Sequence, residues 1–417
     1  MEAHLTERIK RTPDGIEAES ILRACVHCGF CNATCPTYQL TGDELDGPRG
    51  RIYQIKRVLE GEAPGASTQL HLDRCLTCRN CETTCPSGVR YGRLLDVGRA
   101  AVAERVTRPA VQRWQRNFWR FALTRQGLFN SAVRIGRALH RLVPPTLRGK
   151  LPSARAAGAW PRATHARKVL LLNGCVQPAL MPSIDAATAR VLDACDIEAV
   201  VAPNSSCCGA IDFHLDAHAA AQARARRNID AWLPLLAGDV EAIVINASGC
   251  SAMVKDYAHL LRDDSTYADK AQRIAAATRD LAEFLPPLLG ALGLRKTATL
   301  PETLRRVVFH PPCTLQHAQK ITGAVENMLT TFGAELVPFA ESHLCCGSAG
   351  TYSILQPEFS LRLRERKLEN LQRGRPAMIL SANIGCLAHL EAAAAVPVRH
   401  WVEWLDSVLT LTDTRAR

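Results

Sequence analysis

Two short cysteine-rich blocks constrain this chain more than any other part of its sequence. The blocks span Cys25–Pro36 and Cys75–Pro86 and lie fifty residues apart. Each places three cysteines at every third position, adds a fourth after three more residues, and follows it directly with proline. A tight loop of this kind can wrap three corners of a compact cluster, so the fourth corner needs a ligand from elsewhere in the fold.

The spacing is that of the bacterial run for 4Fe–4S clusters, in which the fourth cysteine of each run ligates the other cluster. This rule predicts two ligand sets: Cys25, Cys28, Cys31 and Cys85 for the first cluster, and Cys75, Cys78, Cys81 and Cys35 for the second. Proline after each block fixes the backbone as it leaves the cluster. Zinc would favour separated C-x-x-C pairs, and disulfides would need an oxidising compartment, so an iron–sulfur site is the preferred interpretation.

The length and cysteine content favour a cytoplasmic protein of two or three domains. The chain has 417 residues and seventeen cysteines, and its first segment, Met1–Asp14, is polar and charged, with no apolar stretch after it. The longest weakly polar run, Phe284–Leu294, is far shorter than the ~20 residues that span a bilayer. We therefore expect a soluble or peripheral protein whose thiols stay reduced and can bind metal.

The net charge of +11 comes from one segment. Residues 105–168 hold 15 of the 51 Lys and Arg and no Asp or Glu, so the rest of the chain has 36 basic against 40 acidic residues. This uneven placement argues against a nucleic-acid-binding protein and indicates a local contact surface. Residues 143–166, rich in Pro, Ala and Arg, are typical of an extended linker.

Residues 101–141 are predicted to be helical, and aromatic residues are interleaved with the arginines. These are Trp114, Phe118, Trp119, Phe121 and Phe129. Such a segment could lie on an anionic membrane surface or dock on a partner. The alternative, which the sequence favours slightly, is a connecting helix with aromatics in the core and solvated arginines.

The N-terminal module is predicted to be helical outside the cysteine loops. Residues 1–24 form a lead-in in which Ile16, Ile21 and Leu22 are expected to pack. A second helix opens at D-G-P-R-G, with Asp46 as a plausible cap and Pro48 in the first turn, and buries Ile52, Ile55, Val58 and Leu59. Arg49 and Arg51 could equally be solvated or face a cluster or a partner.

From Lys168 onward, short apolar runs alternate with helical stretches. The strand-like runs are Val169–Leu172, Ala199–Val201, Ala242–Ile245, Val307–Phe309, Leu336–Pro338 and Met378–Leu380. Alternation of this kind predicts α/β layers with parallel sheets, and no G-x-G-x-x-G follows a strand. The expected fold is a multidomain α/β chain: a ferredoxin-type domain (1–100), a basic helical segment and linker (101–166), and two repeated lobes (167–300 and 301–417).

The two lobes repeat a pattern of cysteines. The first set is Cys175, Cys207, Cys208 and Cys250, and the second is Cys313, Cys345, Cys346 and Cys386. The offsets between the sets are 138, 138, 138 and 136 residues. Two homologous lobes explain this regularity, with these cysteines near the carboxyl ends of strands, where ligands sit in open parallel sheets. The alternatives are a further cluster or redox site and small buried hydrophobes; the doubling favours a site.

The lobe pattern resembles the cysteine-rich "CCG" domain of the heterodisulfide reductases, whose relatives include iron–sulfur subunits of glycerol-3-phosphate, lactate and glycolate dehydrogenases. In the reductase, the resemblance implies unusual clusters that act on disulfides. This chain departs from the reductase at the last motif, because Cys250-Ser-Ala-Met253 and Cys386-Leu-Ala-His389 stand where the reductase has C-x-x-C. The two histidines beside the other lobe cysteines, His310 and His343, are interpreted as packed residues in preference to ligands.

Over nearly its whole length, the chain is similar to the family of iron–sulfur subunits of bacterial glycolate dehydrogenase, also called glycolate oxidase. The motifs that carry this resemblance are S-I-L-R-A-C-V-H-C-G-F-C, D-E-L-D-G-P-R-G-R-I-Y, H-L-D-R-C-L-T-C-R-N-C-E-T-T-C-P-S-G-V-R-Y, P-C-T-L-Q-H-A-Q-K and S-H-L-C-C-G-S-A-G-T-Y. It implies a subunit that works with flavin-containing subunits in oxidising glycolate to glyoxylate.

The expected role is electron transfer, with no catalytic residue, flavin or NAD on this chain. Oxidation of a 2-hydroxy acid needs a hydride or two-electron acceptor, usually a flavin, whereas clusters suit one-electron steps. We expect two 4Fe–4S clusters to carry electrons from a partner's flavin to a quinone-type acceptor, at the inner face of the cytoplasmic membrane. The alternatives are a disulfide reductase acting at the lobe cysteines, or the same relay for lactate or glycerol-3-phosphate.

Overall fold

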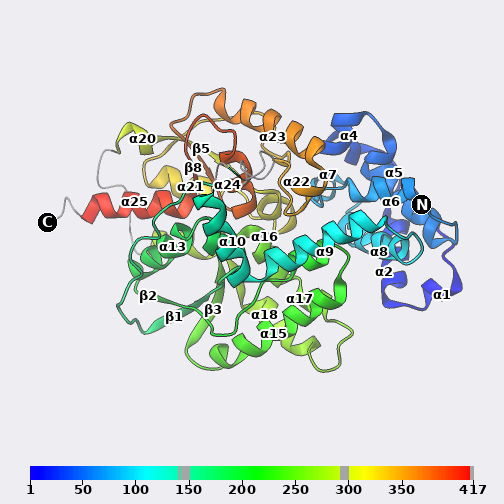
Figure 1. Cartoon of the computed structure of the whole chain (residues 1–417), viewed down its shortest axis with the longest axis horizontal. Helices are drawn as coiled ribbons and strands as arrows, with labels where there is room; N and C mark the ends of the chain where they lie inside the picture. The colour runs from blue at the N-terminus through cyan, green and yellow to red at the C-terminus, as the bar shows by residue number, and fades with distance from the viewer. Residues whose placement is uncertain (140–141, 143–150, 292–299, 414–417) are drawn as a thin grey trace. The chain divides into compact units, whose positions relative to one another are not determined.

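The computed structural model describes residues 1–139, 142, 151–291 and 300–413 (Figure 1). They form two compact units, each of which is discontinuous in sequence. The first unit comprises Met1–Asn117, Gln316–Ala318 and His343–Lys367, and the second comprises Phe118–Leu315, Gln319–Ser342 and the chain from Leu368 onward. The predictions for 143–150 and 292–299, which include part of the expected linker and Leu294, lie outside the described residues.

The N-terminal part of the first unit is helical. Its elements are α1 Glu7–Lys10, α2 Pro13–Ala24, α3 Phe30–Ala33, α4 Pro36–Thr41, a 3₁₀ turn η1 Glu44–Asp46, α5 Pro48–Leu59, α6 Ala66–Asp73, α7 Asn80–Thr84 and α8 Tyr91–Ala103. Helix α2 starts with the Thr12 side chain accepting a hydrogen bond from Gly15 N, and buries Ile21 and Leu22. Ile16 is 62% exposed, so its expected packing is wrong: it lies on the opposite face of α2.

Helix α5 forms the centre of this module. Its buried face includes Ile52, Ile55, Val58 and Leu59, as predicted. It starts with Pro48, where the missing N–H costs nothing, because the first turn of a helix leaves its N–H groups without intrahelical partners. Asp46 does not cap this helix, contrary to the expectation: Gly47 occupies the cap position, and the Asp46 carboxylate is fully buried among cationic side chains.

A segment of the second lobe completes the first unit. Its helices here are α22 Tyr352–Leu355 and the first part of α23 Pro357–Gln372. Tyr352 donates its hydroxyl hydrogen to Arg74 O (3.1 Å), and the Arg74 guanidinium stacks on the Phe359 ring at 5.0 Å. Thr83 Oγ1 lies 3.0 Å from His317 Nδ1. Nothing in the sequence indicates that a segment from beyond residue 340 belongs with the first cysteine blocks.

The second unit contains two four-stranded sheets, and every strand pair in them is parallel. One sheet has the order β2-β1-β3-β4: β1 Arg167–Leu171, β2 Ile197–Val200, β3 Val240–Ile245 and β4 Thr278–Asp280. The other has the order β6-β5-β7-β8: β5 Arg306–His310, β6 Glu335–Leu336, β7 Met378–Ser381 and β8 Val398–His400. These matching orders confirm the predicted α/β class and the repeat.

Helices flank both sheets. They are α10 Gln126–Ala138, α12 Gln177–Leu180, α13 Ser183–Asp193, α14 Ala210–His214, α15 His218–Leu236, α16 Ser248–Lys255, α17 Tyr257–Leu260, α18 Ala268–Ala277, α19 Leu281–Ala291, α20 Glu302–Arg305, the π turn η3 Thr314–Ala318, α21 Ala324–Thr331, the end of α23, α24 Ile384–Glu391 and α25 Trp401–Asp413. The first lobe's core packs Leu170 and Ile243 of the sheet against Ile229 and Trp232 of α15, all fully buried. Burial of this kind stabilises a fold by roughly 25 cal/mol per Å² of apolar surface.

The two lobes meet through the loops that follow their central strands. Ser248 N donates to Ala382 O (3.1 Å), and Gly249 N donates to the Asn383 side chain (3.2 Å). His400 Nε2 donates to Asn246 O (2.9 Å), and burial lowers the pKa of this histidine to about 3, so it stays neutral there. These contacts place the carboxyl ends of β3 and β7 side by side.

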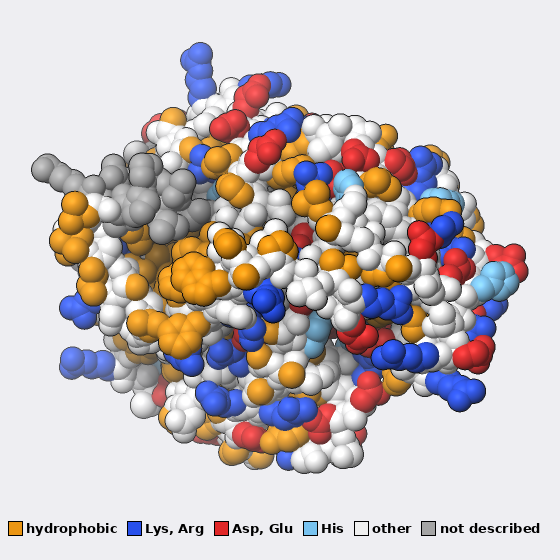
Figure 2. All heavy atoms as spheres, turned by 45° about the vertical axis from the view of Figure 1, so that its right-hand side comes forward, with side chains coloured by type: hydrophobic (Ala, Val, Ile, Leu, Met, Phe, Trp, Pro, Cys, Tyr) orange, Lys and Arg blue, Asp and Glu red, His pale blue; other side chains and the backbone are white. Residues whose placement is uncertain are grey.

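Three of the five aromatic residues of the basic segment, Trp114, Phe118 and Phe121, are exposed, so the slightly favoured interpretation is wrong for them; Trp119 and Phe129 are half-buried. On α9 Ala110–Thr124, Val111, Trp114, Phe118 and Phe121 recur at helical spacing, and each is at least 43% exposed. Some of the arginines are paired instead: Arg116 with Asp73 (3.1 Å), and Arg120 with Asp212 (2.9 Å). Figure 2 shows hydrophobic side chains gathered on one face among Lys and Arg.

Candidate metal centres

The two cysteine loops share one backbone conformation. In the first, His27 and Gly29 have positive φ angles of 60° and 88°; in the second, Thr77 and Arg79 occupy the equivalent positions with φ of 54° and 60°. Three of these four are not glycine, and such residues adopt this conformation only where the surroundings impose it. Two left-handed residues per loop turn the chain so that successive cysteines face the same side.

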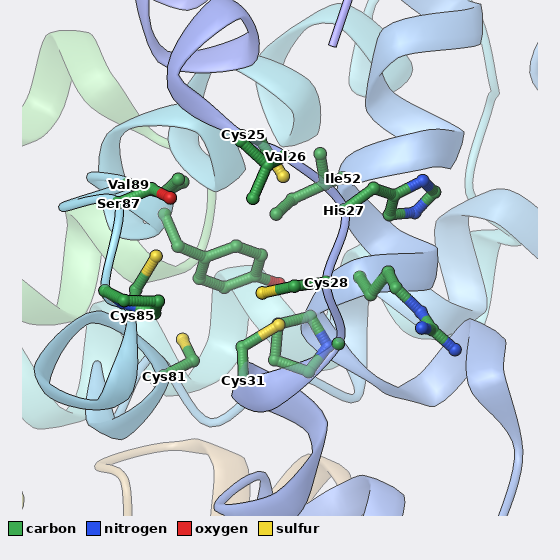
Figure 3. A pocket seen from close by; sticks show the side chains of 15 residues that line it. Cys25, Val26, His27, Cys28, Cys31, Ile52, Cys81, Cys85, Ser87 and Val89 are labelled. Atoms are coloured by element: carbon green, nitrogen blue, oxygen red, sulfur yellow. The ribbon is translucent and has the colours of Figure 1, made fainter.

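The first cavity brings together the cysteines predicted for the first cluster. Cys25, Cys28 and Cys31 line it from one loop and Cys85 from the other, around about 430 Å³ of space that is partly open to solvent. Cys81 also borders it. Figure 3 shows the sulfur atoms of these side chains, which come from two separate segments of chain, arranged around the cavity.

The second cavity has the complementary set. Cys75, Cys78 and Cys81 line it together with Cys35, around about 300 Å³ of empty space. Each cavity is thus lined by all four cysteines of one predicted set, and Cys81 alone borders both cavities; that these sets ligate clusters stays a prediction. Two contacts orient the thiols: Tyr91 donates its hydroxyl hydrogen to Cys75 Sγ (3.7 Å), and Cys35 Sγ lies 3.3 Å from Thr37 Oγ1.

The residues at these cavities fit an iron–sulfur cluster. Burial raises the pKa of the Cys31 thiol to about 11 and also raises the pKa of Cys25 and, further, of Cys81. Neighbouring thiols add to the rise, because several thiolates close together repel one another. A bound metal reverses this cost, since its positive charge deprotonates the thiols that ligate it.

A buried charged network lies beside the second cavity. Asp46 accepts hydrogen bonds from His71 Nδ1 (2.8 Å) and Arg74 Nη1 (2.9 Å), and lies 3.5 Å from Arg51 Nη2. Asp43, Asp46 and His71 offer ligand atoms close enough for a cation, but Asp46 is already engaged by the two arginines, so the group is a charge network. Sequence reasoning missed it, because Arg74 and His71 lie more than twenty residues away.

Arg51 is the cation of this network that faces the cysteines. Its side chain is only 1% exposed and lines the second cavity. Burial by itself lowers the pKa of its guanidinium, but Cys75, Tyr91, Cys35 and Asp46 together hold it above its ordinary value. The guanidinium is therefore a permanent buried positive charge.

The first lobe's four motif cysteines form one cluster of thiols in the second unit. The thiols of Cys175 and Cys208 lie close to that of Cys207 and hold its pKa well below the ordinary value. Cys207 and Cys250 in turn raise the pKa of Cys208 well above its ordinary value. The strand-end prediction explains this convergence: Cys175 and Cys250 follow β1 and β3, which are neighbours in the sheet.

Buried polar side chains hold the Cys-Cys-Gly turn of this lobe. Asn228 Nδ2 donates to Cys207 O (3.2 Å), and Tyr257 donates its hydroxyl hydrogen to Cys208 O (2.8 Å). Gly209 then turns the chain with φ of 93°. A turn with its carbonyls fixed in this way presents both sulfurs in one orientation.

The second lobe's cysteines are divided between the units. Cys345 and Cys346 belong to the first unit, and Cys313 and Cys386 to the second. Within the first unit, burial raises the pKa of Tyr352, with contributions from both Cys75 and Cys345. Within the second unit, Asn383 Nδ2 donates to Cys386 Sγ (3.7 Å).

Of the two histidines named from the sequence, His310 is fully buried and His343 is half-buried. His310 is fully buried, with its Nδ1 3.1 Å from Ser381 Oγ, and the backbone carbonyl of His343 lies 2.9 Å from His317 Nε2. The remaining cysteine, Cys195, is buried outside both motifs. All seventeen cysteines lie in the described ranges, and none of them is in a disulfide.

Comparison with known families gives the class of this protein. Residues 21–89 match the 4Fe-4S dicluster domain, and residues 169–255 and 307–391 match the cysteine-rich domain. The chain is therefore an iron–sulfur protein with one dicluster module and two cysteine-rich domains. It is 51% identical to the glycolate oxidase iron-sulfur subunit of Escherichia coli over 98% of this chain and 99% of that protein. The chain belongs to the family of glycolate oxidase iron–sulfur subunits.

More distant relatives match the chain at lower identity. A probable glycolate oxidase iron-sulfur subunit of Bacillus subtilis is 30% identical over 89% of each chain. Lactate utilization protein A of Exiguobacterium is 26% identical over 53% of this chain and 88% of that protein. The described residues contain no helix long and apolar enough to cross a bilayer.

Proposed function

We propose that this chain is the electron-transfer subunit of a complex that oxidises glycolate to glyoxylate. Electrons pass from a flavin on partner subunits, through two 4Fe–4S clusters on this chain, to a quinone-type acceptor. The observation that carries the proposal is the pair of cavities, each lined by the four thiols of one crossed ligand set. The similarity to the Escherichia coli subunit supports glycolate as the substrate of the complex.

The proposed ligand sets are Cys25, Cys28, Cys31 and Cys85 for the first cluster, and Cys75, Cys78, Cys81 and Cys35 for the second. Clusters of this kind supply one-electron transfers between a two-electron donor and an acceptor. The chain's own residues orient the ligands and shield the cavity. The left-handed loop residues aim the thiols, and the apolar side chains of Ile52 and Val89 limit the access of water to the first cavity.

We further propose that Cys175, Cys207, Cys208 and Cys250 form an additional iron–sulfur site in the first lobe. Their thiols lie close enough to shift one another's pKa, and three of the four are buried, so together they offer four soft ligands, the donor set that iron–sulfur clusters take. Disulfide reduction at the same thiols is the second candidate, favoured by the lowered pKa of Cys207, because a thiolate is the attacking species in thiol–disulfide exchange.

The function is tested on the complex purified anaerobically from its own host through a tag on this chain. Flavin is expected to co-purify, and glycolate is expected to reduce a soluble quinone at least tenfold faster than lactate or glycerol 3-phosphate. In Cys81→Ser, which removes the thiol bordering both cavities, glycolate still reduces the flavin but quinone reduction falls at least a hundredfold. Unchanged quinone reduction in this variant, or a complex without flavin, contradicts the proposal.

We propose that the complex binds the inner face of the cytoplasmic membrane through the exposed apolar face of α9. Four apolar side chains line this face, Arg113 is exposed beside it, and the Arg125 guanidinium stacks on the Phe121 ring at 3.6 Å. Aromatic side chains flanked by arginine are typical of helices that lie in a lipid interface.

Trp114→Ala is expected to weaken binding to phosphatidylglycerol-containing vesicles by roughly tenfold, as the loss of one large apolar side chain predicts. Flotation of the purified complex measures it. Trp160→Ala is the matched control, since Trp160 is exposed to 41% but lies outside the helix. Equal binding by the two variants and the wild type would argue for a protein partner on this face.

A further inference from the structure

The buried guanidinium of Arg51 has one donor group without a hydrogen-bond partner among the described residues. Its Nε donates to His71 O (2.7 Å) and its Nη1 donates to Thr37 Oγ1 (3.1 Å). Its Nη2 is buried and makes no hydrogen bond to any described residue. A buried donor left unsatisfied costs about 1–3 kcal/mol, and more when it is charged, so this atom requires an acceptor.

The acceptor that would satisfy this group lies in the second cavity. Arg51 lines that cavity with Cys35, Cys75, Cys78 and Cys81. Asp46 provides only an ion pair to Nη2, at 3.5 Å, because its oxygens already accept from His71 and Arg74. The sulfur atoms of a cluster in that cavity are the remaining acceptors, and hydrogen bonds to cluster sulfur are a known determinant of reduction potential.

The first cavity has no equivalent group among the residues that line it. Its arginine, Arg49, is 37% exposed, and its charge is neutralised by Glu44, whose carboxylate accepts from Arg49 Nε at 2.5 Å. At the second cavity, Arg51 and Arg74 share the single carboxylate of Asp46 with the His71 ring. Beside the second cavity there is therefore one more arginine than carboxylate, and the fully buried charge of Arg51 is screened far less than the exposed Arg49–Glu44 pair.

We propose that Arg51 is a positioning residue that donates a hydrogen bond from Nη2 to a sulfur of the second cluster and raises its reduction potential above that of the first. The inference rests on the proposed function, since it assigns a cluster to each cavity. Adding one electron makes a cluster more negative by one charge, and a nearby fixed cation stabilises that reduced form. When the two clusters together take up one electron, that electron would then reside on the second cluster.

The test is a redox titration of the anaerobically purified complex with dithionite as the one-electron donor, followed by electron paramagnetic resonance. In Arg51→Gln, the midpoint of one cluster is expected to fall by about 59 mV or more, a tenfold change in electron distribution. The midpoint of the other cluster stays unchanged. Arg57→Gln is the matched control, because Arg57 lies on the same helix but is exposed and pairs with Glu62.

A second variant and a measurement on the wild type keep the test decisive if Arg51→Gln loses its iron. Arg51→Lys retains the positive charge but loses the several N–H donors of the guanidinium. The midpoint potential of the affected cluster is therefore expected to fall by less in this variant than in Arg51→Gln. In wild-type protein carrying arginine labelled with the heavy nitrogen isotope, one reduced cluster is expected to show a hyperfine coupling to guanidinium nitrogen. Unshifted midpoints in both variants, or the absence of that coupling, overturn the inference while leaving the clusters and the proposed function standing. Wild-type protein without cluster signals contradicts the proposed function itself.

Discussion

Replacing Cys207 and Cys208 with serine is expected to remove about four iron atoms from the chain, from about twelve to about eight. The reason is the convergence of four thiols in the first lobe, three of them buried and that of Cys250 half-buried; these substitutions remove two of the four. A serine hydroxyl is a hard ligand that replaces a thiolate poorly at iron–sulfur sites. Iron and acid-labile sulfide per chain, measured on anaerobically purified protein, give the result.

Two comparison variants make this measurement specific. Cys195→Ser removes a cysteine of the same lobe that is buried but stands outside the motif, and it is expected to keep all the iron. Cys345→Ser/Cys346→Ser tests the equivalent turn of the second lobe. About eight iron atoms in the wild type, unchanged in Cys207→Ser/Cys208→Ser, would mean that the first lobe holds no cluster and would favour thiol chemistry there.

The Gly50→Ala substitution is expected to destabilise the first unit by about 3 kcal/mol or more. An added Cβ would lie 2.1 Å from the backbone oxygen of Glu44 and 3.1 Å from Leu45 Cα. Alanine normally gains about 1 kcal/mol over glycine inside a helix, but this contact is far inside the van der Waals limit, so the clash dominates. The turn cannot move away easily, because Gly47 N and Gln54 Nε2 donate to its carbonyls.

Thermal unfolding of the purified protein checks this result, with an expected fall in Tm of about 6 °C or more. Gly65→Ala is the matched control in the same unit, because a Cβ at that position meets no atom within 4 Å. If the two variants melt together, α5 can shift away from the Glu44 turn, and the close approach is not a constraint.

The sequence predicted the repeated lobes well, because their signals are local. Six strands follow runs of apolar residues, and their observed bounds differ from the predicted ones by only a few residues. The two strands that were missed, β4 and β8, are three residues long and read T-R-D and V-R-H. Because of their charged residues, the hydrophobic pattern does not predict these strands, which are defined by pairing with a neighbouring strand and not by their own hydrophobicity.

The candidate centres could be predicted only as far as ligand spacing carries information. The eight cysteines of the blocks line two cavities, with all four members of each predicted set at one cavity and Cys81 at both, but nothing local indicates that Asp46 and Arg51 are buried together. From the sequence alone, Asp46 and Arg51 are predicted to be polar residues in the first turns of a helix. Their burial depends on His71 and Arg74, which reach them only after the chain folds back.

The sequence also failed on α9 for a physical reason. A helix whose apolar and basic residues alternate can bury either set, and the hydrophobic pattern alone cannot say which. Here the acidic partners Asp73 and Asp212, distant in sequence, engage Arg116 and Arg120 and leave Trp114 exposed.

The discontinuous first unit has a consequence for the order in which this protein can be made. Its two cysteine loops emerge from the ribosome early, yet the segment His343–Lys367 that completes the unit is translated some 260 residues after Cys85. Contacts separated by such a distance form late, because the intervening chain must exist and fold before they can close. Until then, Arg74 lacks Phe359 and Tyr352. The N-terminal module is thus completed only after most of the chain has been synthesised.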